Sequence, residues 1–185
     1  MEHEPAALPG RPGQPGQVGQ WVLLAYRMPR QPSAPRIAIW RKLERLGVAR
    51  LGDGLVALPG DARTREQFDW IAEEIVAGQG TATVWLAVPG SLTQERAIAG
   101  QMQADRRAEY QTVIIAAQAA TNARPGERSR TAGRLRAELR RIARRDFFPP
   151  AERDSAHQAV RALADPDKKP DPQQRAAASR KDENR

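Results

Sequence analysis

The chain has 185 residues, a formal net charge of +8 and no cysteine. The missing thiols exclude a disulfide framework, a thiolate nucleophile and a cysteine-based metal site. No apolar run approaches the ~18 residues that a membrane span needs. The start of the chain carries two glutamates and lacks the apolar stretch of a signal peptide. We therefore expect a cytoplasmic protein that makes no membrane contact.

Composition also predicts where the chain folds. Proline and glycine dominate residues 1–19, and the end of the chain is polar and interrupted by proline. Such segments cannot bury enough apolar surface to offset chain entropy. We expect disordered tails at residues 1–19 and 164–185, and a folded domain at residues 20–163 that is long enough for a core.

The first predicted element is a strand at residues 20–28, whose near-continuous apolar run is typical of a central strand buried on both faces. A helix follows at residues 35–46, with Ile39, Leu43 and Leu46 at helical spacing. Gly47 can adopt the left-handed conformation that ends a helix.

Two short apolar runs, residues 48–51 and 55–58, follow this helix. Asp53-Gly54 between them predicts a hairpin, because a primed turn needs positive φ at its centre. Asp61 or Thr64 can cap a second helix.

That second helix has Phe68, Ile71 and Ile75 on one side and ends before Gly78. Residues 81–88 form the last predicted strand. The order β-α-β-β-α-β at residues 20–89 predicts an α+β fold, a ferredoxin-like antiparallel sheet with both helices on one face. Later helices or a second subunit are then needed to cover the other face.

The four tryptophans are interpreted as packing residues. Trp40 and Trp70 lie on the apolar stripes of the two helices, and Trp21 and Trp85 lie in strands. Stacking on nucleic-acid bases is the alternative use of such side chains.

A C-terminal helical segment is predicted at residues 90–163. Ser91 can cap a long helix that reaches about residue 123, with an interruption near Gly100. A second helix is expected at residues 131–145, and a short third helix at residues 151–163. Between the last two, residues 146–150 contain Phe147 and Phe148, which we expect to pack under the domain.

Positive charge is concentrated in one part of the chain. Residues 124–145 carry nine arginines and two glutamates, a distribution expected of a surface that binds phosphates. Coding bias is the competing explanation, because arginine outnumbers lysine 26 to 4.

Two sets of cationic side chains are candidates for DNA contact. The first flanks the apolar seam of the helix at residues 131–145, from which guanidinium groups can bind phosphates with two hydrogen bonds each. Ordinary surface pairing with Glu138 and Asp146 is the alternative. The second, weaker set fills the polar face of the first helix. The two sets are Arg134, Arg136, Arg140, Arg141, Arg144 and Arg145, and Arg36, Arg41, Lys42 and Arg45.

Catalytic residues are not apparent. His3 and His157 are isolated, so their spacing gives no metal site. Glu73 and Glu74 are adjacent and diverge on a helix, which makes them a poor acid–base pair. There is also no glycine-rich phosphate loop with a following lysine. We expect no enzymatic activity, no catalytic or metal-binding residue and no cofactor.

Four segments resemble the N-terminal domain of the chromate-resistance regulators called ChrB. They are WVLLAYRMP, RIAIWRKLERLGVARLGDGLVALP, RRAEY and LRRIARRDFFPPAE. The second segment is also similar to the phenylacetate-pathway repressors, whose domain is like that of the CRISPR adaptation nuclease. That nuclease would need an acidic residue near the end of the first strand, where this chain has Tyr26-Arg27-Met28-Pro29.

The resemblance implies a chromate-responsive transcriptional regulator. We expect a DNA-binding regulator, or accessory factor, of a chromate-resistance operon that binds promoter DNA and uses the ferredoxin-like unit as scaffold and as the surface of a candidate homodimer. In that family a larger second domain usually follows and is thought to help sense the oxyanion. We expect this domain to be missing here, so that sensing would need a separately encoded sensor-domain protein. The rival hypothesis is a non-enzymatic protein-interaction module that pairs with such a protein. Direct oxyanion capture by the arginines is a third.

Overall fold

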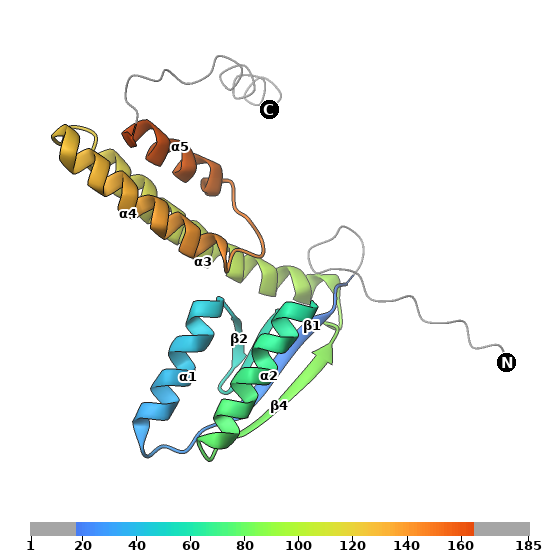
Figure 1. The fold of residues 1–185 in the computed structure, drawn as a ribbon. Helices are drawn as coiled ribbons and strands as arrows, with labels where there is room; N and C mark the ends of the chain where they lie inside the picture. The colour runs from blue at the N-terminus through green and yellow to red at the C-terminus, as the bar shows by residue number, and fades with distance from the viewer. Residues whose placement is uncertain (1–17, 165–185) are drawn as a thin grey trace. The chain divides into compact units, whose positions relative to one another are not determined.

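The computed structural model describes residues 18–164, so the predicted tails fall largely outside the described residues. Figure 1 shows helices combined with one antiparallel sheet, and the fold class is α+β. The elements in chain order are β1 (Trp21–Arg27), α1 (Ser33–Leu46), β2 (Ala49–Gly52), β3 (Leu55–Pro59), α2 (Ala62–Ala77), β4 (Thr81–Ala87), α3 (Leu92–Ala119), α4 (Pro125–Ala143) and α5 (Glu152–Ala164).

The described chain divides into two compact units. The first comprises residues 18–108 and 142–150 and holds the whole sheet with α1 and α2. The second comprises residues 109–141 and 151–164 and is wholly helical. Of the three boundaries, one falls inside α3, one falls near the end of α4, and one falls between α4 and α5.

The sheet of the first unit has the strand order β2-β3-β1-β4, and every neighbouring pair is antiparallel. β1 is therefore an inner strand, as its apolar run predicts. Val22 pairs with Leu58 on one side and with Leu86 on the other. Since side chains alternate across a strand, this register places Val22, Leu24, Val56 and Leu58 on one common face.

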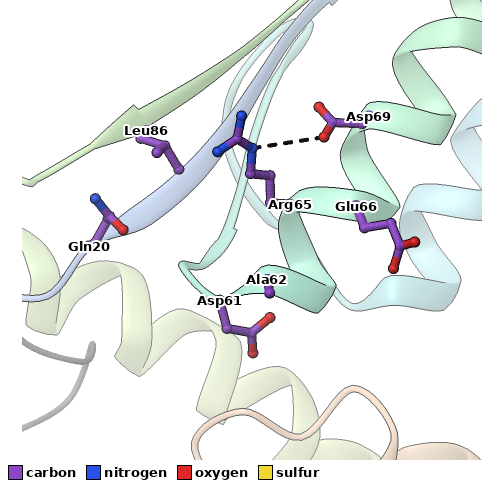
Figure 2. Close-up of a pocket in the computed structure, with 7 residues that line it drawn as sticks. All are labelled: Gln20, Asp61, Ala62, Arg65, Glu66, Asp69 and Leu86. Atoms are coloured by element: carbon purple, nitrogen blue, oxygen red, sulfur yellow. Dashed lines mark ion pairs between the residues drawn. The ribbon is translucent and has the colours of Figure 1, made fainter.

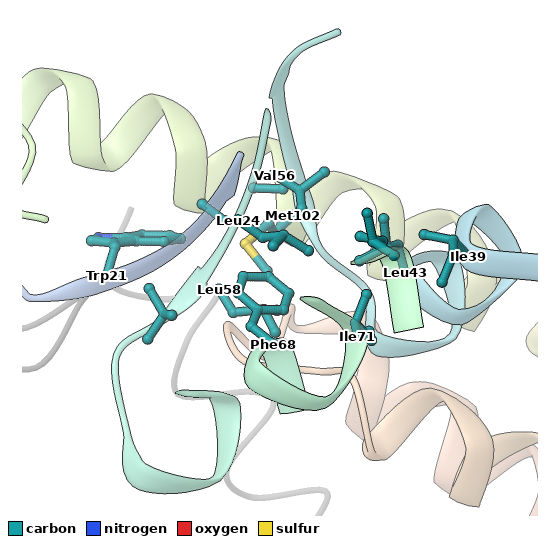
Figure 3. Packing of buried hydrophobic residues seen from close by; sticks show 13 residues of the cluster. Trp21, Leu24, Ile39, Leu43, Val56, Leu58, Phe68, Ile71 and Met102 are labelled. Carbon is teal, nitrogen blue, oxygen red and sulfur yellow. The ribbon is translucent and has the colours of Figure 1, made fainter. Parts of the chain in front are cut away.

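That face packs against α1 and α2 to form the core shown in Figure 3. α1 contributes its predicted apolar residues Ile39 and Leu43, and α2 contributes Phe68, Ile71 and Ile75. All five side chains are buried, so the helical periodicity correctly predicts the two packed stripes.

The opposite sheet face is partly covered within the first unit. Trp21 is buried there, and its ring lies 6.0 Å from that of Phe148, which comes from the segment after α4. Phe147 and Phe148 both pack against the core, which confirms their predicted place under the domain. Met102 of α3 adds to the same cluster.

Several local signals act as predicted. Gly47 ends α1 with φ of 70°, and Gly54 in the hairpin has φ of 71°. Both values lie in the left-handed region, which glycine adopts without steric cost. Asp61 and Thr64 act together in a capping box at the start of α2: the Asp61 carboxylate accepts from the Thr64 amide at 2.7 Å, and Thr64 Oγ1 accepts from the Asp61 amide at 3.0 Å.

Two helix predictions need correction. α3 continues without interruption through Gly100, because one glycine costs only about 1 kcal/mol in a helix that good helix formers otherwise fill. α4 begins at Pro125, six residues before the predicted start. Proline at the first helical position lacks only an N–H that would be unpaired there, so Pro125 was a usable signal.

The tryptophan prediction holds for one residue of four. Trp21 is 1% exposed, but Trp40, Trp70 and Trp85 are 49%, 59% and 57% exposed. Trp40 lies beside the buried stripe of α1, and Trp70 lies on the outer side of α2. The Arg50 guanidinium lies 5.9 Å from the centre of the Trp40 ring, within the range of a cation–π contact.

The second unit has its own apolar core. Tyr110, Val113 and Ala117 are the buried residues of its part of α3. α4 and α5 each add an apolar stripe at helical spacing. These stripes are Ala132, Leu135 and Leu139 of α4, and Ala156, Val160 and Leu163 of α5.

Candidate nucleic-acid interface

The candidate interface in the second unit is the solvent side of α4. Leu135 and Leu139 are buried, whereas Arg134, Arg136 and Arg140 are exposed. A helix places residues four apart on the same side, so Arg136 and Arg140 form one row. The apolar stripe thus anchors the helix and leaves its cationic side in solvent.

A second row of arginines lies on the other flank of this solvent side. Arg130 and Arg134 are four residues apart, and Arg141 is seven residues beyond Arg134, which is also a helical repeat. All three are exposed. We define these two rows, Arg130, Arg134, Arg136, Arg140 and Arg141, as the α4 cationic face.

Carboxylates neutralise little of the α4 cationic face. Arg141 forms an ion pair with Glu138 one turn earlier, and both side chains are solvent-accessible. Within residues 18–164, no ion pair is found for Arg130, Arg134, Arg136 or Arg140. Exposed pairs such as Arg141–Glu138 are worth about 0–1 kcal/mol, so a phosphate can compete for the guanidinium group.

The last two predicted arginines of this set follow α4 and belong to the first unit. Arg144 is exposed, but Arg145 is half-buried. A Cβ atom built on Gly47 would lie 2.7 Å from Arg145 Cβ, so Arg145 packs closely against the end of α1. This contact suits Arg145 to a structural role.

The cationic residues predicted on α1 are in a different environment. Arg36, Arg41 and Arg45 are exposed, but Lys42 forms an ion pair with Glu74 of α2. On the same helix Glu44 pairs with Arg50 of β2. Carboxylates are therefore close to this set, which weakens the local positive potential compared with α4.

Glu95 is a buried carboxylate that the sequence interpretation missed. It is 2% exposed, accepts a hydrogen bond from the Gly19 amide at 3.0 Å and lies 3.4 Å from Trp21 Nε1. Glu95 is in the first turn of α3, where a negative charge interacts favourably with the helix dipole. It joins the start of β1 to α3, and its place in the first turn of a helix is a signal that the sequence offers.

A hollow of ≈ 350 Å³ lies between the first turns of α2 and the end of β4 (Figure 2). Its one cationic side chain, Arg65, and two of its three carboxylates already have partners. Arg65 Nε is 3.8 Å from Asp69 Oδ2, and Asp61 caps α2. Leu86 supplies an apolar wall.

A second hollow of ≈ 420 Å³ lies on the sheet face opposite α1 and α2. Leu23, Ala57 and Ala87 line it from the sheet, and Gln94 and Ile98 line it from the start of α3. The lining holds no charged side chain, so it offers nothing to neutralise an oxyanion.

Among residues 18–164, no group of three or more histidine, aspartate or glutamate side chains is placed to hold a metal ion. In the same part of the chain, no helix combines the length and the apolar character that crossing a bilayer requires.

Burial raises the pKa of Tyr26, with Arg50 lowering it and Glu44 raising it to lesser extents.

These features define an α+β protein whose second unit presents a cationic helix face. Comparison with protein families matches residues 36–169 to the family described as protein ChrB, N-terminal, and the chain belongs to this family. Membership associates the chain with the regulation of chromate resistance. Among curated proteins, none matches the chain.

Proposed function

We propose that this chain is a DNA-binding regulator, or an accessory factor, of a chromate-resistance operon, and that the α4 cationic face contacts the phosphates of the promoter. The observation that carries the proposal is the exposure of Arg134, Arg136 and Arg140 beside the buried Leu135–Leu139 stripe. The family supports the regulatory role.

The two arginine rows match the chemistry of duplex DNA. A duplex presents two lines of phosphates, and each guanidinium group can donate two parallel hydrogen bonds to one phosphate. Because the rows lie on opposite flanks of α4, they can reach both lines while the apolar stripe stays buried. Such contacts position a protein on DNA but do not read its bases.

We place the weaker α1 set outside this contact surface. Lys42 forms an ion pair with Glu74, and Glu44 adds a carboxylate on α1 itself. Arg145 is also left out, because it packs against Gly47. Arg144, which is exposed and follows the last residue of α4, stays a candidate.

The sheet unit acts in this proposal as a non-catalytic scaffold in the cytoplasm. Its element order and its strand order β2-β3-β1-β4 support a ferredoxin-like classification. The one cationic side chain that lines either hollow, Arg65, pairs with Asp69, and in this proposal a separately encoded sensor-domain protein is the candidate partner.

Fluorescence anisotropy with labelled operon promoter DNA tests the proposal. We expect binding at low salt, and an affinity at least about tenfold weaker when Arg134, Arg136, Arg140 and Arg141 are replaced by glutamine. The matched control replaces four exposed arginines elsewhere, Arg27, Arg30, Arg63 and Arg96, by glutamine and has the same net charge.

The control variant distinguishes binding through the α4 cationic face from an effect of net charge alone. Equal weakening in both variants would mean that only net charge matters. No binding by the unaltered chain at low salt would remove the DNA-binding function, and circular dichroism checks that both variants are folded.

A further inference from the structure

The helix layer of the first unit has a cationic row on α1. Ile37, Arg41 and Arg45 are spaced four residues apart, so they lie on one side of the helix. All three are exposed, and Ile37 is 42% exposed. The row faces away from the core because Ile39 and Leu43, the buried residues, occupy the opposite side.

The neighbouring helix α2 has an acidic row with an aromatic residue at its centre. Glu66, Trp70 and Glu73 follow a spacing of four and three residues, and all are exposed. Figure 2 shows Glu66 pointing away from the Arg65–Asp69 ion pair. The outer side of this layer thus has opposite charges on adjacent helices.

The charged residues of the α1 row form no ion pairs with those of the α2 row within residues 18–164. The ion pair that joins the helices uses Lys42 and Glu74, which lie between the two rows. Over residues 18–164, no ion pair is found for Arg41, Arg45, Glu66 or Glu73. The α1 row therefore presents two cations, and the α2 row presents two carboxylates beside an exposed indole ring, with the exposed Arg63 at its N-terminal end.

We propose that this layer is the contact surface for a second copy of the chain. In a two-fold dimer each surface meets its own copy, so a patch with one positive and one negative half is self-complementary. The α1 row of one protomer faces the α2 row of its partner, and the same contact occurs twice.

The free energy of dimerisation and the relative orientation of the two protomers depend on different side chains. Trp70 and Ile37 supply apolar surface, and a buried tryptophan contributes about 150–250 Å² of contact area. The exposed charge pairs add little affinity but fix the antiparallel pairing of positive and negative helices. A foreign acidic or basic partner would match only one of the two rows.

Charge reversal gives a direct test by analytical ultracentrifugation of the full chain. Arg41→Glu with Arg45→Glu makes both rows acidic, and Glu66→Arg with Glu73→Arg makes both rows basic. Each variant alone should have a dimer dissociation constant at least about 100-fold higher, because like charges then meet across the interface.

Mixing the two variants should restore the dimer as a one-to-one pair, because every contact again joins opposite charges. Trp70→Glu should also dissociate the dimer, and Arg96→Glu on α3 should leave it intact. A monomeric unaltered chain at about 100 μM and low salt, or a mixture that stays monomeric, would overturn the proposal. DNA binding by α4 is measured separately, so either function can fail alone.

Discussion

Gly54 shows how one residue fixes the hairpin between β2 and β3. Its φ is +71°, and an added Cβ would lie 2.2 Å from the Tyr26 carbonyl oxygen. Gly52, two residues earlier, has no such neighbour within 4 Å. We expect Gly54→Ala to lower the free energy of unfolding by about 2 kcal/mol or more.

Gly52→Ala is the matched control for this change and should alter stability by less than about 0.5 kcal/mol. Urea denaturation followed by circular dichroism measures both values. Equal effects at the two positions would mean that the close approach to Tyr26 does not constrain the hairpin.

Tyr26 gives the fold a dependence on alkaline pH. Burial raises the pKa of its phenol above 10.0, so the folded chain holds this proton more tightly than the unfolded chain does. The stabilising difference is present below about pH 10 and disappears as the pH rises through the folded pKa.

We therefore expect the urea midpoint to fall when the pH is raised from about 9 to about 11, and to fall less in Tyr26→Phe. An identical fall in both proteins would assign the alkaline decrease in stability to other groups.

Residue environments were predicted unevenly from the sequence. The conformations of Gly47 and Gly54 follow from backbone sterics, so local sequence was sufficient. The exposure of Trp40, Trp70 and Trp85 depends on how far each element extends past its neighbours, which periodicity does not encode. The hydrogen bonds of Glu95 join residues that are distant in sequence and share that limit.

At the level of elements, the start of α2 depends on reciprocal capping by Asp61 and Thr64. Asp61→Ala removes the acceptor of the Thr64 amide and should cost about 1 kcal/mol of stability. Asp69→Ala on the same helix removes only the long Arg65–Asp69 pair and should cost less than about 0.5 kcal/mol.

Thermal denaturation of these two variants compares the stability contributed by the N-cap with the stability contributed by the Arg65–Asp69 ion pair. If Asp69→Ala were the more destabilising change, the surface pair rather than the cap would hold the start of α2.

Element boundaries show what the sequence can predict. β1, the hairpin, α2 and α5 follow from apolar spacing and turn residues, because those signals are local. The continuity of α3 through Gly100 could not be read locally, since one unfavourable residue is outweighed by the rest of a long helix.

At the level of the whole molecule, charge density predicted the basic segment but not the environment of each arginine. Arg134, Arg136 and Arg140 remain in solvent, Arg141 pairs with Glu138, and Arg145 packs against Gly47. The Arg141–Glu138 pair is local, since the two residues are one helical turn apart, whereas the contact of Arg145 with Gly47 depends on residues that folding brings together. The composition of the segment alone therefore cannot separate a binding face from ordinary surface charge.

The salt dependence of promoter binding tests the central claim most directly, because it reports how many phosphates the protein neutralises. The slope of log K against log salt becomes shallower by about 0.9 for each phosphate that is no longer neutralised. Glutamine at Arg134, Arg136, Arg140 and Arg141 should make the slope shallower by about two to four units, while the control variant keeps the slope of the unaltered chain. Parallel lines for all three proteins would contradict phosphate binding through α4.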